Sequence, residues 1–126
     1  MISTNFIAER CLMEMDVTEL QPGVIAVTLK GRLDIDGAHA IDLRFNAVTS
    51  NSRGVLVEMA DVTFLASIGI RTLLSAARTV RRRGGRFVLL EPNQAVTELL
   101  EVSGMLEYMP VFQGRDEAMA ALAGAA

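Results

Sequence analysis

Two strongly apolar segments on either side of an amphipathic one limit this chain to few folds. The segments GVLVEM at 54–59 and RFVLLE at 86–91 are nearly continuous apolar runs, which is typical of strands buried on both faces of a sheet. Between them, apolar residues recur at the spacing of a helix: Ile70, Leu73, Leu74, Ala77 and Val80. Polar residues fall on the opposite side of this helix, before Gly84 and Gly85 end it: Arg71, Ser75, Arg78 and Arg82. Strand, helix and strand in this order predict a right-handed crossover and parallel pairing.

The N-terminal part of the chain predicts a β-hairpin. Apolar and acidic residues alternate over 12–17, and apolar and β-branched residues fill 24–31. The pair Pro22 and Gly23 between them favours a turn. For residues 1–11 the sequence allows two alternatives: they extend the first strand, or they trail from it without regular structure.

Further helices are expected before the apolar run at 54–59 and after the run at 86–91. An apolar stripe indicates a helix over 37–50, with Asp36 as its side-chain cap and Leu43 off the stripe: Ala38, Ile41, Phe45 and Val48. Later in the chain, Pro92 opens a helix that Gly104 ends, and the apolar positions of this helix are Val96, Leu99 and Leu100. Residues 108–112 form a short strand at most, and the alanine-rich tail from 115 predicts a last helix.

These elements predict an α/β fold: a mixed, mostly parallel β-sheet of four to five strands with about four α-helices. A length of 126 residues with 51% hydrophobic content suits one domain over 1–126. The net charge of -3 argues against a general nucleic-acid binder, which needs an excess of Lys and Arg. No segment has the pattern of a signal peptide or the length of a membrane span, so a cytoplasmic protein is expected.

The sequence shows no convincing arrangement of side chains for catalysis or metal binding. Asp34 and Asp36 could form an acid pair or half a metal site, but aspartates in a loop that leads into a helix more commonly cap it. A single cysteine, Cys11, and a single histidine, His39, exclude an internal disulfide and a Cys/His zinc site. The chain has no phosphate-binding loop, and the glycine pair at 84–85 precedes a strand instead of a helix. The arginine run 81–83 complements the negative end of its helix, which is a simpler explanation than contact with RNA or a membrane. We therefore expect no enzyme activity, no cofactor and no metal.

The segment DVTFLASIGIRTLL at 61–74, after GVLVEM, resembles the signature of STAS domains, the family of anti-sigma-factor antagonists and their relatives. GRLD at 31–34 matches the family's strand end and loop, and Glu58 stands where its members usually carry an acid. EVSGMLEYMPVF at 101–112 matches the segment that closes the third helix. Each motif is short, and their common order and spacing along nearly the whole chain carry the resemblance.

The resemblance implies that Ser67 is the site at which a partner kinase phosphorylates the protein. Many antagonists carry Asp before this serine and a second hydroxyl residue after it, where this chain has Ala66 and Ile68. The residues themselves allow two roles for Ser67. As the N-cap of the helix, its oxygen would accept a hydrogen bond from the N–H of Gly69 or Ile70. As a phosphorylation site, it would hold the phosphate at the positive end of the helix dipole.

The partner-binding surface expected on this basis combines two segments of the chain: Asp34 and Asp36 with Ala66, Ser67, Ile68, Gly69 and Arg71. By resemblance, the partner is a serine-kinase anti-sigma factor, and a serine phosphatase is a second partner. We expect a monomer or weak dimer that neither binds nucleic acid nor spans a membrane. The alternative is a STAS adaptor or scaffold subunit of a stress-signalling or lipid-transport assembly, with Ser67 only a helix cap. A small nucleotide-binding or hydrolytic α/β protein is a third hypothesis, and the missing phosphate loop and catalytic pair argue against it.

Overall fold

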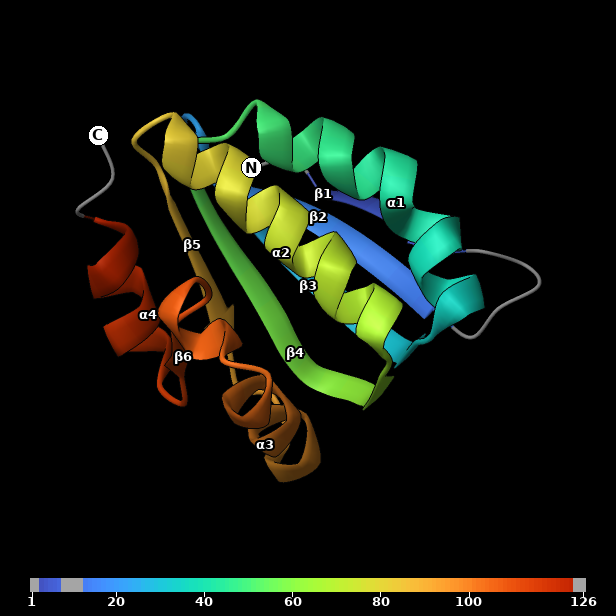
Figure 1. The fold of residues 1–126 in the computed structure, drawn as a ribbon. Helices are drawn as coiled ribbons and strands as arrows, with labels where there is room; N and C mark the ends of the chain where they lie inside the picture. The colour runs from blue at the N-terminus through green and yellow to red at the C-terminus, as the bar shows by residue number, and fades with distance from the viewer. Residues whose placement is uncertain (1–2, 8–12, 124–126) are drawn as a thin grey trace.

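A six-stranded sheet runs through the molecule, with its strands side by side in chain order (Figure 1). The computed structural model describes residues 3–7 and 13–123, and side chains for 13–123, so Cys11 lies outside the described residues. The strands are β1 (Ser3–Ile7), β2 (Met13–Gln21), β3 (Val24–Leu33), β4 (Gly54–Leu65), β5 (Arg86–Leu90) and β6 (Val111–Phe112). The helices are α1 (Ile35–Ser50), α2 (Ser67–Arg82), α3 (Gln94–Val102), α4 (Arg115–Leu122) and the short 3-10 helix η1 (Met105–Glu107). The predicted α/β fold with four α-helices is confirmed.

The sheet is antiparallel at its N-terminal edge and parallel elsewhere. Strands β1, β2 and β3 pair antiparallel, whereas β3, β4, β5 and β6 pair parallel. The predicted hairpin is formed by β2 and β3, and Gly23 makes its turn with a positive φ of 80°. Residues 3–7 form a strand of their own, β1, which runs along β2 from Ser3 opposite Thr18 to Ile7 opposite Glu14.

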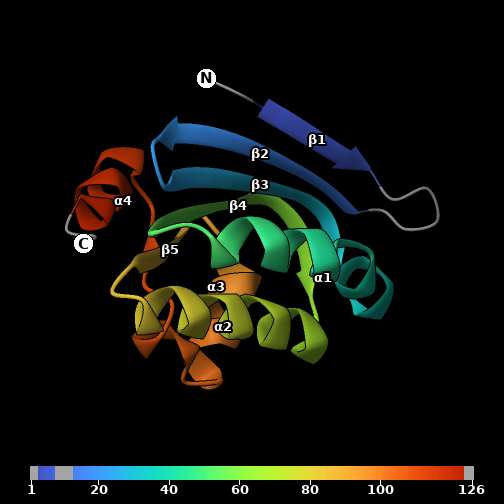
Figure 2. The same cartoon turned by 90° about the horizontal axis from the view of Figure 1, so that it is seen from above.

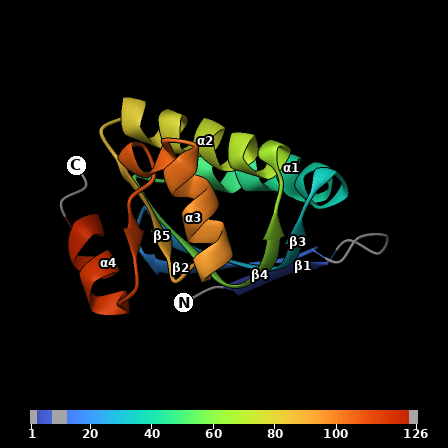
Figure 3. The same cartoon turned by 60° about the horizontal axis from the view of Figure 1, so that its bottom comes forward.

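The helices cover the sheet unequally, and two cores result. Figure 2 shows α1 and α2 lying next to each other on one side of the sheet, and Figure 3 shows α4 apart from them, beside β5. The larger core packs under α1, α2 and α3, with these side chains among its members: Phe45, Val57, Leu73, Phe87 and Leu100. The smaller core lies under α4: Val24, Ala26, Leu56, Val88, Leu90, Ala118 and Leu122. Alternate residues of β4 and β5 therefore enter different cores, which explains their nearly continuous apolar runs.

The helical periodicity of the sequence agrees with the burial of side chains. Leu43, which falls off the apolar stripe of α1, is 86% exposed. On α2, Leu73, Ala77 and Val80 are buried, whereas Arg71 and the other polar residues opposite them are exposed. The helix ends where expected, and Gly84 follows it with a φ of 82°. These faces fix which side of α2 meets solvent along its whole length.

Two predicted helix starts are wrong by one or two residues. The cap of α1 is Asp34, whose Oδ1 accepts a hydrogen bond from the N–H of Gly37 at 2.9 Å, while Asp36 lies inside the first turn. Helix α3 is capped by Asn93, which accepts from the N–H of Val96 at 2.8 Å, and not opened by Pro92. In both cases the cap is the residue with extended backbone, since only from there does a side-chain oxygen reach the N–H three residues on.

Candidate functional site

The carboxyl ends of the neighbouring parallel strands β3 and β4 lie together at one end of the sheet. This brings the starts of α1 and α2 side by side. The N–H of Ala66 donates a hydrogen bond to the carbonyl oxygen of Leu33 at 3.0 Å. Asp34 follows Leu33 and leads into α1, and Ser67 follows Ala66 as the first residue of α2. We call the surface formed by residues 34–37 and 66–71 the helix-start surface. It contains every residue that the sequence assigned to partner binding.

Ser67 is the first residue inside α2, and it is not the N-cap that the sequence suggested. Ala66 has the extended backbone of a cap, with φ -97° and ψ 168°, and its carbonyl accepts the N–H of Ile70 at 3.1 Å. Within the described part of the chain, no side chain caps this helix. The Ser67 side chain is exposed and has no capping hydrogen bond. The hypothesis that Ser67 serves only as a helix cap therefore loses its basis.

The start of α2 lacks the acidic residues that the start of α1 has. Its first turn holds no acidic residue, whereas the first turn of α1 contains Asp36 and is capped by Asp34. The first N–H groups of a helix have no partner inside the helix, and together with the helix dipole they attract anions. A negative group on the Ser67 oxygen would thus meet free N–H donors. Arg71, one turn further along α2, is exposed and lies at the i+4 position relative to Ser67.

Two glycines allow the helix starts to pack against the strand ends. A Cβ on Gly69 would lie 2.6 Å from the carbonyl oxygen of Leu33 and 2.9 Å from Cδ1 of Leu65. A Cβ on Gly37 would likewise overlap the carbonyl oxygen of Arg32. Real Cβ atoms do not approach other atoms so closely. Gly69 is therefore needed for packing.

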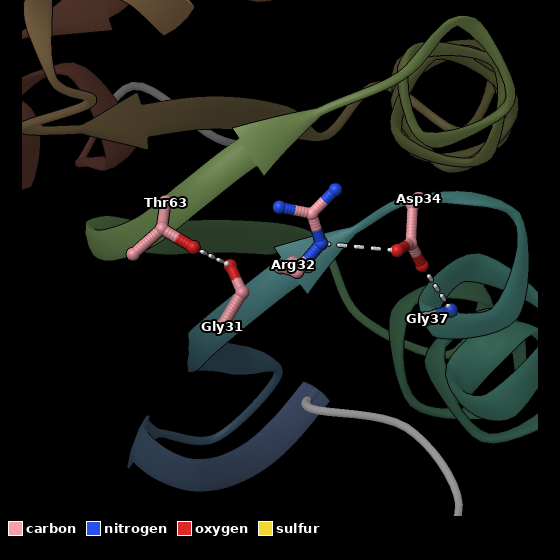
Figure 4. A network of polar contacts seen from close by, with 5 residues as sticks. All are labelled: Gly31, Arg32, Asp34, Gly37 and Thr63. Atoms are coloured by element: carbon pink, nitrogen blue, oxygen red, sulfur yellow. Dashed lines mark hydrogen bonds and ion pairs between the residues drawn. The ribbon is translucent and has the colours of Figure 1, made fainter.

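Asp34 also holds Arg32 in place, as Figure 4 shows together with the bond to Gly37. The Nε of Arg32 donates to Oδ2 of Asp34 at 3.3 Å, and its guanidinium stacks on the ring of Phe64 at 4.4 Å. The hydrogen bond from the N–H of Gly37, followed by the contact with Arg32, lowers the pKa of Asp34 below its ordinary value of 3.8. This carboxylate is therefore charged at neutral pH.

Two exposed apolar side chains, one in the helix-start surface and one beside it, could not be foreseen from the sequence. Ile35, the first residue of α1, is 61% exposed, and Phe64, near the end of β4, is 41% exposed. Ile68 is half-buried and packs against the larger core. The signal that could have revealed Phe64 is the length of β4, which continues past the predicted 54–59 to Leu65. An apolar patch next to charged groups is typical of a protein-binding surface.

Glu58 and His39, which the sequence also singled out, lie outside the helix-start surface. On the opposite face of the sheet, Glu58 accepts a hydrogen bond from Thr28 at 3.1 Å and pairs with Arg115 of α4 at 2.6 Å. His39 is exposed on α1. Over residues 13–123, no three His, Cys, Asp or Glu side chains cluster so that they could hold a metal ion. None of the described helices is both long and apolar enough to cross a membrane.

Comparisons with known proteins bear on the family and on the fold of the chain. The STAS domain model matches residues 17–118. BtrV of Bordetella bronchiseptica, a candidate anti-sigma factor antagonist, is 30% identical over 100 residues, which are 79% of this chain and 86% of BtrV.

Two solved structures show the same fold at low identity. An anti-sigma factor antagonist from Mycobacterium paratuberculosis overlays with a TM-score of 0.76 at 20% identity, over 97% of this chain and 95% of that one. The phosphorylated form of the Bacillus cell fate determinant SpoIIAA overlays with a TM-score of 0.66 at 18% identity, over 84% of this chain and 96% of that one. The family match over most of the chain, the relative at 30% identity and the shared fold lead to one conclusion: this chain belongs to the STAS domain family, the family of the anti-sigma factor antagonists.

Proposed function

We propose that the protein is an anti-sigma-factor antagonist that binds a serine-kinase anti-sigma factor through the helix-start surface, and that phosphorylation of Ser67 switches this binding off. The observation that carries the proposal is the state of Ser67. Its hydroxyl is exposed, does not cap the helix, and lies at a helix start without an acidic residue. SpoIIAA, which shares the fold, has a phosphorylated form.

The unmodified surface offers both apolar contact and complementary charge. Ile35 and Phe64 present exposed apolar area, which gains free energy when a partner covers it. Asp34 and Asp36 add negative charge beside it, so the partner should carry basic side chains opposite them. Binding of this kind needs no catalytic group on this chain, and the protein acts by association alone.

A phosphate on Ser67 would be tolerated by the fold and would oppose binding. It carries a charge of about -1.5 to -2, which the free N–H groups of α2 and the side chain of Arg71 can partly neutralise. Arg32 is already engaged by Asp34 and Phe64. The excess negative charge would therefore add to the charged Asp34, and a partner that approaches this acidic surface would have to desolvate like charges brought close together.

The cellular role follows from which partner is held. When the antagonist binds the anti-sigma factor, the sigma factor that the anti-sigma factor would otherwise hold is free for transcription. When the anti-sigma factor, acting as a kinase, phosphorylates Ser67, the antagonist is released and the sigma factor is held again. A serine phosphatase would return the protein to its binding form. This cycle operates in the cytoplasm, where the sigma factor and ATP are present.

Phosphorylation is tested with the serine-kinase anti-sigma factor of the same organism and ATP, followed by intact-mass measurement and peptide mapping. We expect one added phosphate, located on Ser67, and none on the Ser67→Ala variant. A phosphate on another residue, or none from a kinase that is active on a control substrate, contradicts the switch.

Partner binding is tested by immobilising the same anti-sigma factor and measuring the affinity of variants. Ser67→Asp should bind about tenfold more weakly or worse, which corresponds to about 1.4 kcal/mol, whereas Ser67→Ala should bind like the wild type. The matched control is Gln94→Asp, which adds the same charge at the first residue of α3. Equal loss with Ser67→Asp and Gln94→Asp would show an effect of net charge, and equal loss with Ser67→Ala would show a packing role.

A further inference from the structure

Leu99, Val102 and Tyr108 expose large apolar side chains on neighbouring elements. Leu99 and Val102 lie one turn apart on α3 and are 36% and 88% exposed, and Tyr108, which follows η1, is 36% exposed. Helix η1 packs against α3. We call these three residues the α3 patch. A single exposed apolar side chain needs no explanation, whereas a group of them is typical of a binding surface.

The side of the α3 patch toward α2 is basic. The guanidinium groups of Arg78 and Arg81 lie 5.8 Å and 5.9 Å from the ring centre of Tyr108. Nη1 of Arg81 also donates to the carbonyl oxygen of Glu107 at 3.3 Å, so η1 is held close to α2, as Figure 3 shows. Arg82 is exposed one turn after Arg78, on the same side of α2. Three arginines of α2 therefore flank the patch.

The other side of the α3 patch is acidic. Glu98 and Glu101 are exposed on α3. Together with Gln113, which directly follows β6, they line a hollow in the surface. This side of α3 therefore faces β6, whereas Tyr108 faces α2. The apolar side chains thus lie between a basic side and an acidic side.

The charges on both sides remain available to a partner. Over residues 13–123, none of Arg78, Arg82, Glu98 and Glu101 forms an ion pair. Glu98 accepts a hydrogen bond from the neutral side chain of Gln94 at 3.1 Å, which leaves its charge in place. Opposite charges therefore stand on the two sides of one apolar patch without neutralising each other.

From this arrangement we infer that the α3 patch is a self-association surface, through which two copies of the chain form a two-fold symmetric dimer. In such a dimer the same surface of both copies meets itself. The two-fold rotation about an axis through the patch brings the basic side of one copy to the acidic side of the other. The apolar side chains cover one another at the centre. On both flanks, Arg78 and Arg82 of one copy pair with Glu98 and Glu101 of the other.

A second copy fits this surface better than a nucleic acid or a membrane does. A phosphate surface that approached the arginines would also approach Glu98 and Glu101, which repel it. A protein partner needs an acidic side opposite the arginines and a basic side opposite the glutamates. The patch of a second copy has both of these sides in the required order.

The dimer is weak and separate from the proposed switch. Three large apolar side chains per copy are few for an interface, which suits a transient dimer and not a permanent one. The α3 patch and its flanks share no residue with the helix-start surface. The proposal therefore holds whether or not Ser67 is phosphorylated.

Sedimentation velocity at increasing concentration of the full chain tests the dimer. We expect the mean sedimentation coefficient to rise from that of a monomer to that of a dimer and no further. The rise should shrink in high salt, because exposed ion pairs are screened. A chain that stays monomeric up to about 1 mM would overturn the proposal. A series of growing oligomers would also overturn it, since a two-fold contact closes at two copies.

Charge reversal on the two flanks tests their pairing. Arg78→Glu with Arg82→Glu reverses the basic side, and Glu98→Arg with Glu101→Arg reverses the acidic side. Each double variant alone should self-associate at least about tenfold more weakly, because both flanks then bring like charges together. An equimolar mixture of the two variants should dimerise like the wild type, since the flanks of a mixed pair are again opposite in sign. A mixture that stays monomeric would contradict the two-fold contact.

The apolar centre is tested by Val102→Asp. Leu43→Asp is the matched control, because Leu43 is 86% exposed on α1 and lies outside the patch. Both side chains are exposed, so circular dichroism should show an unchanged fold. Only Val102→Asp should weaken self-association, by about tenfold. An equal loss with both variants would show that the patch has no special role.

A further control separates the patch from net charge and from another partner. Lys30→Glu with Arg53→Glu changes the net charge as much as reversal of the basic side does, at exposed positions outside the patch, and should dimerise like the wild type. Equal weakening by this variant would contradict specific pairing. A monomeric wild type whose binding to the anti-sigma factor is lost with Arg78→Glu and Arg82→Glu would assign the patch to that partner and overturn the dimer.

Discussion

The carbonyl oxygen of Leu33 lies 2.6 Å from the position that a Cβ on Gly69 would take. The same oxygen accepts the N–H of Ala66 at 3.0 Å, so the end of β3 contacts α2 at two successive points. This contact fixes the first turn of α2 against the sheet. The position of Ser67 is therefore determined by backbone packing, and the hydroxyl itself contributes little to it.

The close packing at Gly69 predicts a large effect of a single methyl group. Gly69→Ala should destabilise the protein by about 1 to 3 kcal/mol, because the added Cβ meets backbone and buried side chains that cannot move freely. Urea unfolding monitored by circular dichroism measures this difference. Gly114→Ala is the control, since a Cβ there would meet only the flexible side chain of Glu117 at 3.4 Å. Similar stability of both variants would show that the start of α2 shifts to make room.

The absence of a capping bond at Ser67 predicts that its hydroxyl is dispensable for stability. Ser67→Ala should change the free energy of unfolding by less than about 0.5 kcal/mol, as is usual for exposed positions. Asn93→Ala removes a true cap and should cost about 1 kcal/mol. Chemical denaturation of the two variants under the same conditions compares them. A cost at Ser67 as large as that at Asn93 would mean that the serine caps α2 in solution.

The positive potential at the start of α2 predicts that a negative charge stabilises the unbound protein. Ser67→Asp should raise the free energy of unfolding by about 0.3 to 1 kcal/mol at low ionic strength, because the new carboxylate faces the helix dipole. The gain should shrink in high salt. Thermal unfolding at two salt concentrations measures both effects. A destabilised variant, or a gain that salt leaves unchanged, would argue against this potential.

The lowered pKa of Asp34 predicts how stability changes in acid. Folding lowers this pKa below the ordinary 3.8, chiefly through the hydrogen bond from the N–H of Gly37. The resulting stabilisation is complete above the unfolded value and is lost as the pH falls through the folded one. Asp34→Asn keeps a capping oxygen without the titrating charge, so its stability should depend less on pH over this acidic range. Parallel curves for wild type and variant in a pH series of urea unfolding would contradict this role of Asp34.

The fold could be predicted from the sequence where hydrophobic periodicity is strong. The apolar runs predict that β4 and β5 are buried on both faces, and the stripe of α2 predicts that one face of this helix is buried. The structure shows both. Strand β1 was not assigned, because its five residues show no clear alternation and are ordered by pairing with β2. Tertiary pairing of this kind leaves no local signal in the chain.

The helix starts were harder to predict than the helices, and the candidate site depends on them. Periodicity places an apolar face, but the cap is set by the residue at which the backbone changes from extended to helical. At α2 this residue is Ala66, which lacks a capping side chain, and the serine beside it was the more obvious choice. The exposure of Ile35 and Phe64 depends on how the start of α1 and the end of β4 lie in the fold, which a single sequence does not reveal.

The free hydroxyl of Ser67 also bears on protein turnover. The amount of a protein in a cell depends in part on its unfolded fraction, because proteases and chaperones act on unfolded chains. A group that contributes nothing to folding can be modified without lowering the free energy of unfolding. Phosphorylated molecules would then be degraded no faster than unmodified ones, so a shift toward the phosphorylated form would not reduce the total quantity of the protein.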